Sequence, residues 1–185
     1  MRKKTKPSTL PKLQNPKSHL EIERKFLLKK FPQEVINKYK ANLQVLNIIQ
    51  YYFFIDGIWQ RYRKVDTLGK KTKFIHTIKH SIQSGIYEEL ENSVPEKEFL
   101  KKQSVNKNNY AVIKKTRYVI KHKKLKFEID VYKGLRMVIL EVELPDLNHS
   151  FEYPEGLQNE IVYEVTGIKQ FSNFSLAAKH KYDKK

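Results

Sequence analysis

Apolar and polar residues alternate along most of the chain from Leu20 onward, which is the period of a β-strand whose two faces meet different surroundings. Eight segments rich in Ile, Val, Phe, Tyr and Thr carry this pattern: 20–28, 48–55, 58–65, 73–80, 86–94, 113–121, 125–132 and 137–144. Turns that contain glycine separate several of them, at 56–57, 68–69, 84–85 and 133–134. The pattern predicts a sheet of antiparallel strands.

Helical intervals are fewer and are predicted at 32–41, 95–104, 154–164 and 171–181. The second begins at Pro95 and has Glu96 and Glu98 in its first turn, where acidic side chains are favourable. Eight strands with a few helices predict an α+β fold, namely an eight-stranded antiparallel β-barrel, or tunnel, with the helices packed outside.

Charged residues recur on one face of each predicted strand. On the first strand Glu21, Glu23 and Lys25 share a face, opposite Ile22, Phe26 and Leu28, with Arg24 on the apolar side. Later strands place together Arg61 with Arg63, Thr77 with Lys79, Glu89 with Glu91, Lys115 with Arg117, Glu128 with Asp130, and Glu141 with Glu143.

These charges have two interpretations. An antiparallel sheet that covers a core on one side exposes its polar side to water, so all of them could be solvated. Acids that occur in pairs, bases that occur in pairs, and helices able to cover the apolar face favour a charged lumen instead. Charges inside a lumen must be paired or must bind ions.

The composition limits the partners. The chain has 185 residues, enough for one domain, and a formal net charge of +17, which indicates an anionic partner or substrate. We expect a basic, unstructured leader at 1–18, the folded domain at 19–180 and a basic tail at 181–185. No apolar run is long enough to span a bilayer, no secretory signal is evident and no cysteine is present, which is typical of a cytoplasmic protein.

A lumen with acids on one wall and Arg and Lys on the others is suited to a linear polyanion and its cations. Mg²⁺ and Mn²⁺ bind carboxylate oxygens and bridge phosphate oxygens. The planar fork of arginine donates two parallel hydrogen bonds to phosphate. Phosphoryl transfer requires mainly positioning and neutralisation of charge.

In these charged elements the chain resembles the CYTH superfamily, also called the triphosphate tunnel metalloenzymes. The similar elements appear in order as Glu21-Ile-Glu23-Arg-Lys25, Arg61-Tyr-Arg63, Thr77-Ile-Lys79, Glu89-Leu-Glu91, Lys115-Thr-Arg117-Tyr118, Glu128-Ile-Asp130, Glu141-Val-Glu143, Val165-Thr-Gly167 and Phe171-Ser-Asn173. The likeness covers roughly residues 20–180. It implies an eight-stranded tunnel that binds triphosphate-containing substrates together with Mg²⁺ or Mn²⁺.

The resemblance also implies roles for single residues. The metal would be bound by Glu21, Glu23 and Glu143, with Glu141 and Asp130 supporting a second ion or the attacking water. The substrate would be bound by Lys25, Arg61, Arg63, Lys79 and Arg117, and these bases would be oriented by Glu89, Glu91 and Glu128. The catalytic set would be Glu21, Glu141 and Lys25. Tyr87 stands where many members carry an arginine, and Phe171 replaces a common tyrosine.

The resemblance predicts a metal-dependent hydrolase of inorganic triphosphate (tripolyphosphate) or of an organic triphosphate. A class IV-type adenylate cyclase and a thiamine triphosphatase are alternatives, since Trp59 and Tyr62 could stack on a base or simply pack. A module that binds polyphosphate or nucleic acid without catalysis is a further alternative. Paired acids argue against nucleic acid as the main partner. The oligomeric state stays open, a homodimer being one option.

Overall fold

The computed structural model describes residues 17–55, 57–105 and 110–182, which form nine strands and three α-helices. The strands are β1 (Lys17–Leu28), β2 (Gln44–Ile55), β3 (Ile58–Thr67), β4 (Lys73–Gln83), β5 (Ile86–Ser93), β6 (Tyr110–His122), β7 (Leu125–Tyr132), β8 (Val138–Leu144) and β9 (Ile161–Glu164). The helices are α1 (Gln33–Lys38), α2 (Glu96–Val105) and α3 (Asn173–Tyr182).

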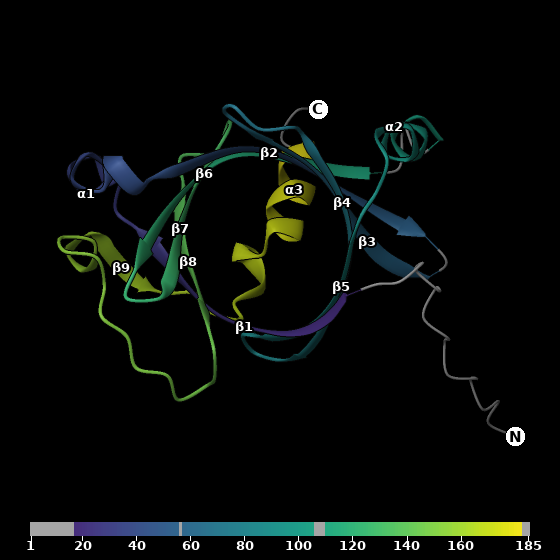
Figure 1. Ribbon diagram of the computed structural model, residues 1–185. Helices are drawn as coiled ribbons and strands as arrows, with labels where there is room; N and C mark the ends of the chain where they lie inside the picture. The colour runs from purple at the N-terminus through teal and green to yellow at the C-terminus, as the bar shows by residue number, and fades with distance from the viewer. Residues whose placement is uncertain (1–16, 56, 106–109, 183–185) are drawn as a thin grey trace, which may run out of the picture.

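The first eight strands close into an antiparallel barrel. Their order is β5-β4-β3-β2-β6-β7-β8-β1, and β1 closes the ring because it also pairs with β5. The pairing of β1 with β5 ends at Ile22, and its pairing with β8 begins there. Ile22 lies opposite both Ile86 of β5 and Leu144 of β8. Figure 1 looks along this barrel. The predicted eight-stranded barrel is therefore confirmed.

Two helices cover the outside of the barrel. Around α1, Val35 and Ile36 join a core with Phe26, Phe127 and Leu140, which point outward from β1, β7 and β8. Around α2, the buried side chain of Phe99 packs with outward-facing aromatic residues of β2 and β3, among them Phe53 and Tyr62. The apolar faces of the strands thus pack outward against helices, which leaves the charged faces to line the lumen.

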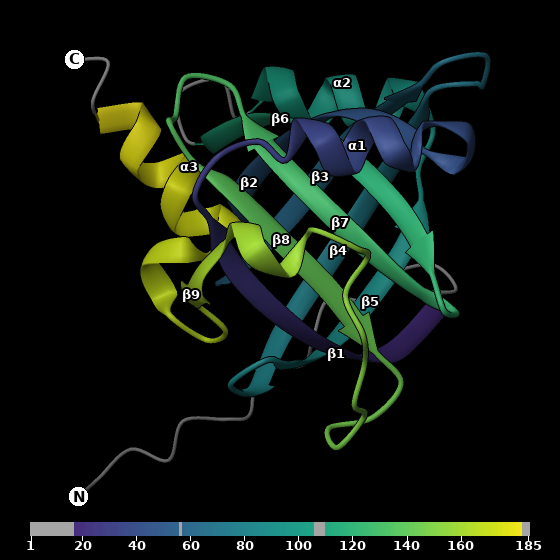
Figure 2. The ribbon, with the colours of Figure 1, turned by 90° about the vertical axis from the view of Figure 1, so that its left-hand side faces the viewer.

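The third helix lies across one end of the barrel rather than beside its wall, as Figures 1 and 2 show. Leu176 and Ala177 of α3 form a core with Ala111, Ile113 and Ile139. These three strand residues lie on the lumen-facing side of β6 and β8, as the charged residues do. They lie near the α3 end of the barrel, where the lumen becomes apolar. An apolar helix face is buried there, which is why the expectation of helices only on the outside fails for α3.

The predicted helix at 154–164 is wrong for most of its length. Only a 3-10 turn at Gln158–Glu160 is helical, and Ile161–Glu164 forms β9. β9 pairs with Phe26–Leu28 of β1, beyond the stretch of β1 that pairs with β5, so a free strand edge was available to it. The predicted helix at 32–41 is shorter, since α1 ends at Lys38 and a 3-10 turn follows at Lys40–Asn42.

The first strand and the last helix reach slightly beyond the limits of the expected domain. β1 begins at Lys17, two residues before the expected domain, and α3 extends to Tyr182. The rest of the expected leader and tail lies outside the described residues. In the described part of the chain, no helix has the length and apolar character needed to cross a membrane.

Candidate functional site

The charged residues predicted to share faces do face the lumen. They line a cavity of about 170 Å³ together with His19, Gln50 and Asn173. Its basic residues are Lys25, Arg61, Arg63, Lys79, Lys115 and Arg117. Its acidic residues are Glu21, Glu23, Glu89, Glu91, Glu128, Glu141 and Glu143. Asp130 is fully buried beside the cavity wall. The strands therefore bring all the predicted site residues to one side of the sheet.

One ionic network spans β1, β3, β4 and β5. Lys79 Nζ contacts Glu21 and lies 3.6 Å from Glu23 Oε1 and 3.3 Å from Glu89 Oε1. Arg61 donates to the same Glu89 oxygen at 3.2 Å. The register explains these contacts, because Lys79 lies directly opposite Glu89 in the β4–β5 pair. Three carboxylates thus surround one lysine.

A second network spans β6, β7 and β8 around Arg117. Its guanidinium donates to both oxygens of Asp130, at 2.7 Å each, to Glu141 at 2.5 Å and to Glu128. A fork that contacts three carboxylates is held rigidly and cannot be replaced by the single point charge of a lysine. Arg117 lies directly opposite Asp130 in the register of β6 and β7.

Lys25 connects the two networks across β1 and β8. Its Nζ lies 3.2 Å from Glu23 Oε1 and 2.9 Å from Glu141 Oε1. Burial lowers the pKa of Lys25, but the two carboxylates outweigh burial and hold it well above its ordinary value. In the structure Lys25 is therefore a charged ion-pair partner of both acids.

Lys115 and Asn173 belong to the site although no role was predicted for them. Lys115 is fully buried and lies 2.5 Å from Asp130 Oδ2. Asn173, at the start of α3, accepts a hydrogen bond from Lys115 at 3.3 Å and one from the Tyr132 hydroxyl at 2.9 Å. The parity of Lys115 with Arg117 was a signal in the sequence, whereas the position of α3 was not.

Burial and neighbouring charges shift the titration of several groups. Burial raises the pKa of Glu21 to about 7, with Lys79 opposing the shift and Glu23 and Glu89 adding to it. Burial also acts to raise the pKa of Glu89, but Arg61 and Lys79 outweigh it and lower that pKa to about 2. Burial and the nearby Arg117 lower the pKa of Lys115 to about 8. Two neighbouring carboxyls with pKa values this far apart are typical of sites that transfer protons.

The lumen carboxylates have the donor chemistry for a hard divalent cation. Glu23 and Glu143 are direct partners in the β1–β8 register, and Glu23 Oε1 is buried without a hydrogen bond despite the nearby Lys25 ammonium. Glu143 is exposed, and Glu21 is held by Lys79. Within the described residues, no three His, Asp or Glu side chains are arranged to hold a metal as they stand. A cation at Glu23 therefore requires the lysines to change partners.

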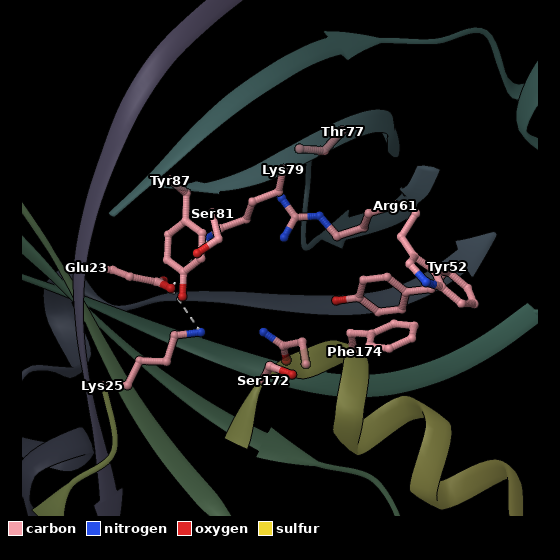
Figure 3. A pocket seen from close by; sticks show the side chains of 12 residues that line it. Glu23, Lys25, Tyr52, Arg61, Thr77, Lys79, Ser81, Tyr87, Ser172 and Phe174 are labelled. Carbon is pink, nitrogen blue, oxygen red and sulfur yellow. Dashed lines mark ion pairs between the residues drawn. The ribbon is translucent and has the colours of Figure 1, made fainter. Parts of the chain in front are cut away.

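A second cavity of about 230 Å³ lies beside α3 and joins lumen residues to aromatic ones. Figure 3 shows Lys25, Lys79 and Arg61 on its charged side and Phe174 on the other. The rings of Trp59 and Phe174 are 4.5 Å apart, and Trp59 is 45% exposed. An aromatic opening therefore continues into the charged lumen.

Two tyrosines differ in their relation to this site. Tyr62 points outward, where it is buried and stacks on His76 at 4.2 Å, so it is a packing residue. Tyr87 lines the second cavity, and the Lys79 ammonium lies 3.9 Å from the centre of its ring. Its hydroxyl end points toward Glu23 and Lys25 (Figure 3). Tyr87 thus supports Lys79 by a cation–π contact and adds no charge of its own.

Similar folds occur among solved structures, although no family model and no curated protein matches the chain. The crystal structure of the hypothetical protein NE1496 is 25% identical, covers 85% of this chain and 97% of its own, and has a TM-score of 0.52. A conserved hypothetical protein from Pyrococcus furiosus is 21% identical, with a TM-score of 0.50 over 76% of this chain and 85% of its own. The PH1819 protein from Pyrococcus horikoshii OT3 is 17% identical, with a TM-score of 0.50 over 69% of this chain and 80% of its own. These likenesses show a shared fold and name no activity.

Proposed function

We propose that this protein is a metal-dependent hydrolase of triphosphates, with inorganic tripolyphosphate as the simplest substrate. The observation that carries the proposal is the charge of the lumen. Seven carboxylates and six basic side chains line the cavity, so the lumen has no positive excess to attract a free polyanion. A triphosphate can be neutralised there only if cations enter with it, whereas the basic residues supply directional contacts.

The basic residues would bind the phosphates by exchanging carboxylate oxygens for phosphate oxygens. Arg61 and Arg63 already direct guanidinium groups at Glu89 and Glu91, and one guanidinium nitrogen of Arg117 contacts Glu141. Phosphate oxygens offer the same acceptor geometry. The exchange would free the carboxylates to bind a cation. Bound substrate would therefore favour metal binding, and bound metal would favour substrate binding.

The metal would be held by Glu21, Glu23 and Glu143, with Glu141 and Asp130 nearby. A bound Mg²⁺ or Mn²⁺ would neutralise phosphate charge and supply bound water for attack. Glu21, whose pKa burial raises to about 7, is suited to hold or release a proton near neutral pH. Lys25, between Glu23 and Glu141, would orient both carboxylates and contact a phosphate.

A second candidate is hydrolysis or cyclisation of an organic triphosphate, which the aromatic opening favours. Trp59 is half exposed beside Phe174 and could stack on a planar group while the phosphates lie in the lumen. A nucleoside triphosphate and thiamine triphosphate both have such a group. Cyclisation of ATP would release cyclic AMP and pyrophosphate, whereas hydrolysis would release ADP and phosphate, or AMP and pyrophosphate.

The test is release of phosphate from tripolyphosphate, ATP and thiamine triphosphate, each measured with Mg²⁺, Mn²⁺ or EDTA. We expect metal-dependent release from tripolyphosphate and none with EDTA. A Trp59→Ala variant that loses activity on ATP or thiamine triphosphate alone would favour the organic substrate. If no substrate is hydrolysed and no cyclic AMP forms from ATP with either metal, the enzyme proposal is wrong.

A further inference from the structure

The basic excess of this protein does not reside in its lumen, where acids slightly outnumber bases. Part of it gathers in two hairpin turns. The first is the turn between β3 and β4, which contains Lys70 and Lys71 and is followed by Lys73 at the start of β4. The second is the turn between β6 and β7, which contains Lys123 and Lys124 and has Lys121 and Lys126 on either side. All seven are exposed. We call these seven residues the lysine rim.

The strand register places both turns at the same end of the barrel. Leu46, near the start of β2, lies opposite Thr67 on one side and Arg117 on the other. β3 ends at Thr67, directly before the first turn, and β6 ends five residues beyond Arg117, directly before the second. α3 contacts the other end of β2 through Tyr52 and lies at the opposite end of the barrel (Figure 2). The lysine rim therefore lies at the end of the barrel opposite α3, on two sides of the charged lumen.

The lysines of the second turn are unfavourable for the local structure. Lys123 and Lys124 have φ values of 45° and 69°, in the left-handed region that Asn and Gly adopt more easily in such two-residue hairpins. Lys121 lies directly opposite Lys126, so that two like charges face each other across the hairpin. Within the described residues, Lys123 is the one lysine of this turn and its flanks that has an ion pair. Its partner is Glu152, at 2.5 Å, and the side chains of Lys123 and Glu152 are both more than half exposed. Stability of the turn does not account for four lysines here.

The chemistry of the rim identifies the class of partner. Lysine offers mobile point charges without the planar fork of arginine, and neither turn presents an exposed aromatic ring. Proteins that bind single-stranded nucleic acid combine a basic groove with aromatic side chains on which bases stack. A rim of lysines alone fits a chain recognised only by its charge, and it lies where a linear phosphate chain would leave the lumen.

We propose that the lysine rim docks the outer part of a long inorganic polyphosphate chain while one end of the chain lies in the lumen. The inference rests on the proposed function for the inner end of the chain and adds a second binding surface outside it. Chains longer than tripolyphosphate then bind more tightly, and the additional affinity falls steeply with salt because the rim is exposed to solvent.

The experiment compares three variants of the full chain. The rim variant combines Lys121→Gln, Lys123→Gln, Lys124→Gln and Lys126→Gln. The matched control combines Lys30→Gln, Lys133→Gln, Lys169→Gln and Lys179→Gln, which removes the same charge from exposed lysines at or beyond the strand ends nearest α3. The third is Arg63→Ala in the lumen. Binding of long-chain polyphosphate, tripolyphosphate and a single-stranded RNA is measured at low and high salt, and thermal melting reports folding.

We expect the rim variant to lose roughly an order of magnitude of affinity for long-chain polyphosphate at low salt and to keep the wild-type affinity for tripolyphosphate. The charge-matched control should retain both affinities. Equal losses in the rim variant and the control, or no preference of the wild type for long chains, would overturn the rim. RNA bound as tightly as polyphosphate, with the same dependence on the rim, would reassign the surface to nucleic acid and overturn the stated partner.

The proposed function fails separately. If Arg63→Ala binds tripolyphosphate as the wild type does and no metal-dependent hydrolysis is found, the lumen is not the site for the chain end. That result would contradict end-on binding, whereas rim-dependent binding of long chains would still establish the outer surface.

Discussion

Replacing Glu141 by glutamine tests whether buried carboxylates hold the cations of the lumen in place. Glu141 Oε1 lies 2.9 Å from Lys25 Nζ, and its Oε2 lies 2.5 Å from an Arg117 nitrogen. The Glu141 side chain is 10% exposed and both cationic side chains are 11% exposed. Because glutamine has nearly the same shape, the substitution changes charge rather than packing.

The magnitude follows from these distances and from burial. At an effective dielectric constant of about 20, two opposite charges about 3 Å apart attract by about 5–6 kcal/mol. The loss is smaller than this, since the substitution also removes the cost of burying the carboxylate and leaves one oxygen as an acceptor. Removing one member of a buried ion pair costs about 3–5 kcal/mol. We expect Glu141→Gln to lower the free energy of unfolding by about that amount.

The assay is unfolding in urea, followed by circular dichroism at pH 7. Glu143→Gln is the matched control, because Glu143 is two residues along the same strand and exposed, and we expect it to change stability by about 1 kcal/mol or less. Equal losses for the two variants, or a small loss for Glu141→Gln, would refute the reasoning.

The pH dependence gives an independent check. Burial raises the pKa of Glu141, but Lys25 and Arg117 outweigh burial and hold it well below its ordinary value of 4.5. Its stabilising effect is therefore complete above about pH 4.5 and disappears as the pH falls below that. The stabilities of the wild type and Glu141→Gln should converge in acid, and a difference that persists there would contradict an electrostatic origin.

Three further variants test the site and the fold. Glu23→Gln should abolish metal-dependent phosphate release while Glu88→Gln, on the outer face of β5, retains it; wild-type rates for Glu23→Gln would exclude it from the metal site. Burial, aided by the positive charge of a nearby lysine, lowers the pKa of His76 to about 4, so stability should fall as the pH drops from 6.5 toward 4, and His76→Phe should lose this dependence in urea titrations at pH 4–7. Gly85→Ala should be more destabilising in thermal melts than Gly69→Ala, because both glycines have positive φ but only a Cβ at Gly85 would lie 2.8 Å from backbone and side-chain atoms; equal shifts would show that this contact is not tight.

The turn at Gly85 shows how the fold supports the site. Gly85 O accepts a hydrogen bond from Glu23 N at 2.8 Å, and the turn packs closely against Thr166. Thr166 Oγ1 in turn accepts from Lys25 N at 2.9 Å. The backbone of the Glu23–Lys25 segment is therefore held by residues far along the chain.

Much of the barrel and its lining could be read from local pattern. A strand alternates its faces with a period of two, so the parity of Glu21, Glu23 and Lys25 on β1, and of the pairs on later strands, determined which side chains share a face. Outward apolar residues such as Phe127 then required a cover, which α1 and α2 provide. These features depend only on residues that are neighbours in sequence, because the two-residue period of a strand determines which face each side chain is on.

Features that depend on contacts between distant segments of the chain could not be predicted from the alternation of residues. The sequence carries no local sign that 161–164 would extend the sheet as β9, nor that α3 would lie across one end of the barrel and bring Asn173 to Lys115. Likewise, parity predicts that Arg117 faces the lumen, but only the register of β6, β7 and β8 makes Asp130 and Glu141 its partners. The sequence by itself determined the side of the sheet on which each charge lies, because alternation is local. The tertiary structure decided which charges meet, because closing the barrel sets the distances between strands that are far apart in the chain.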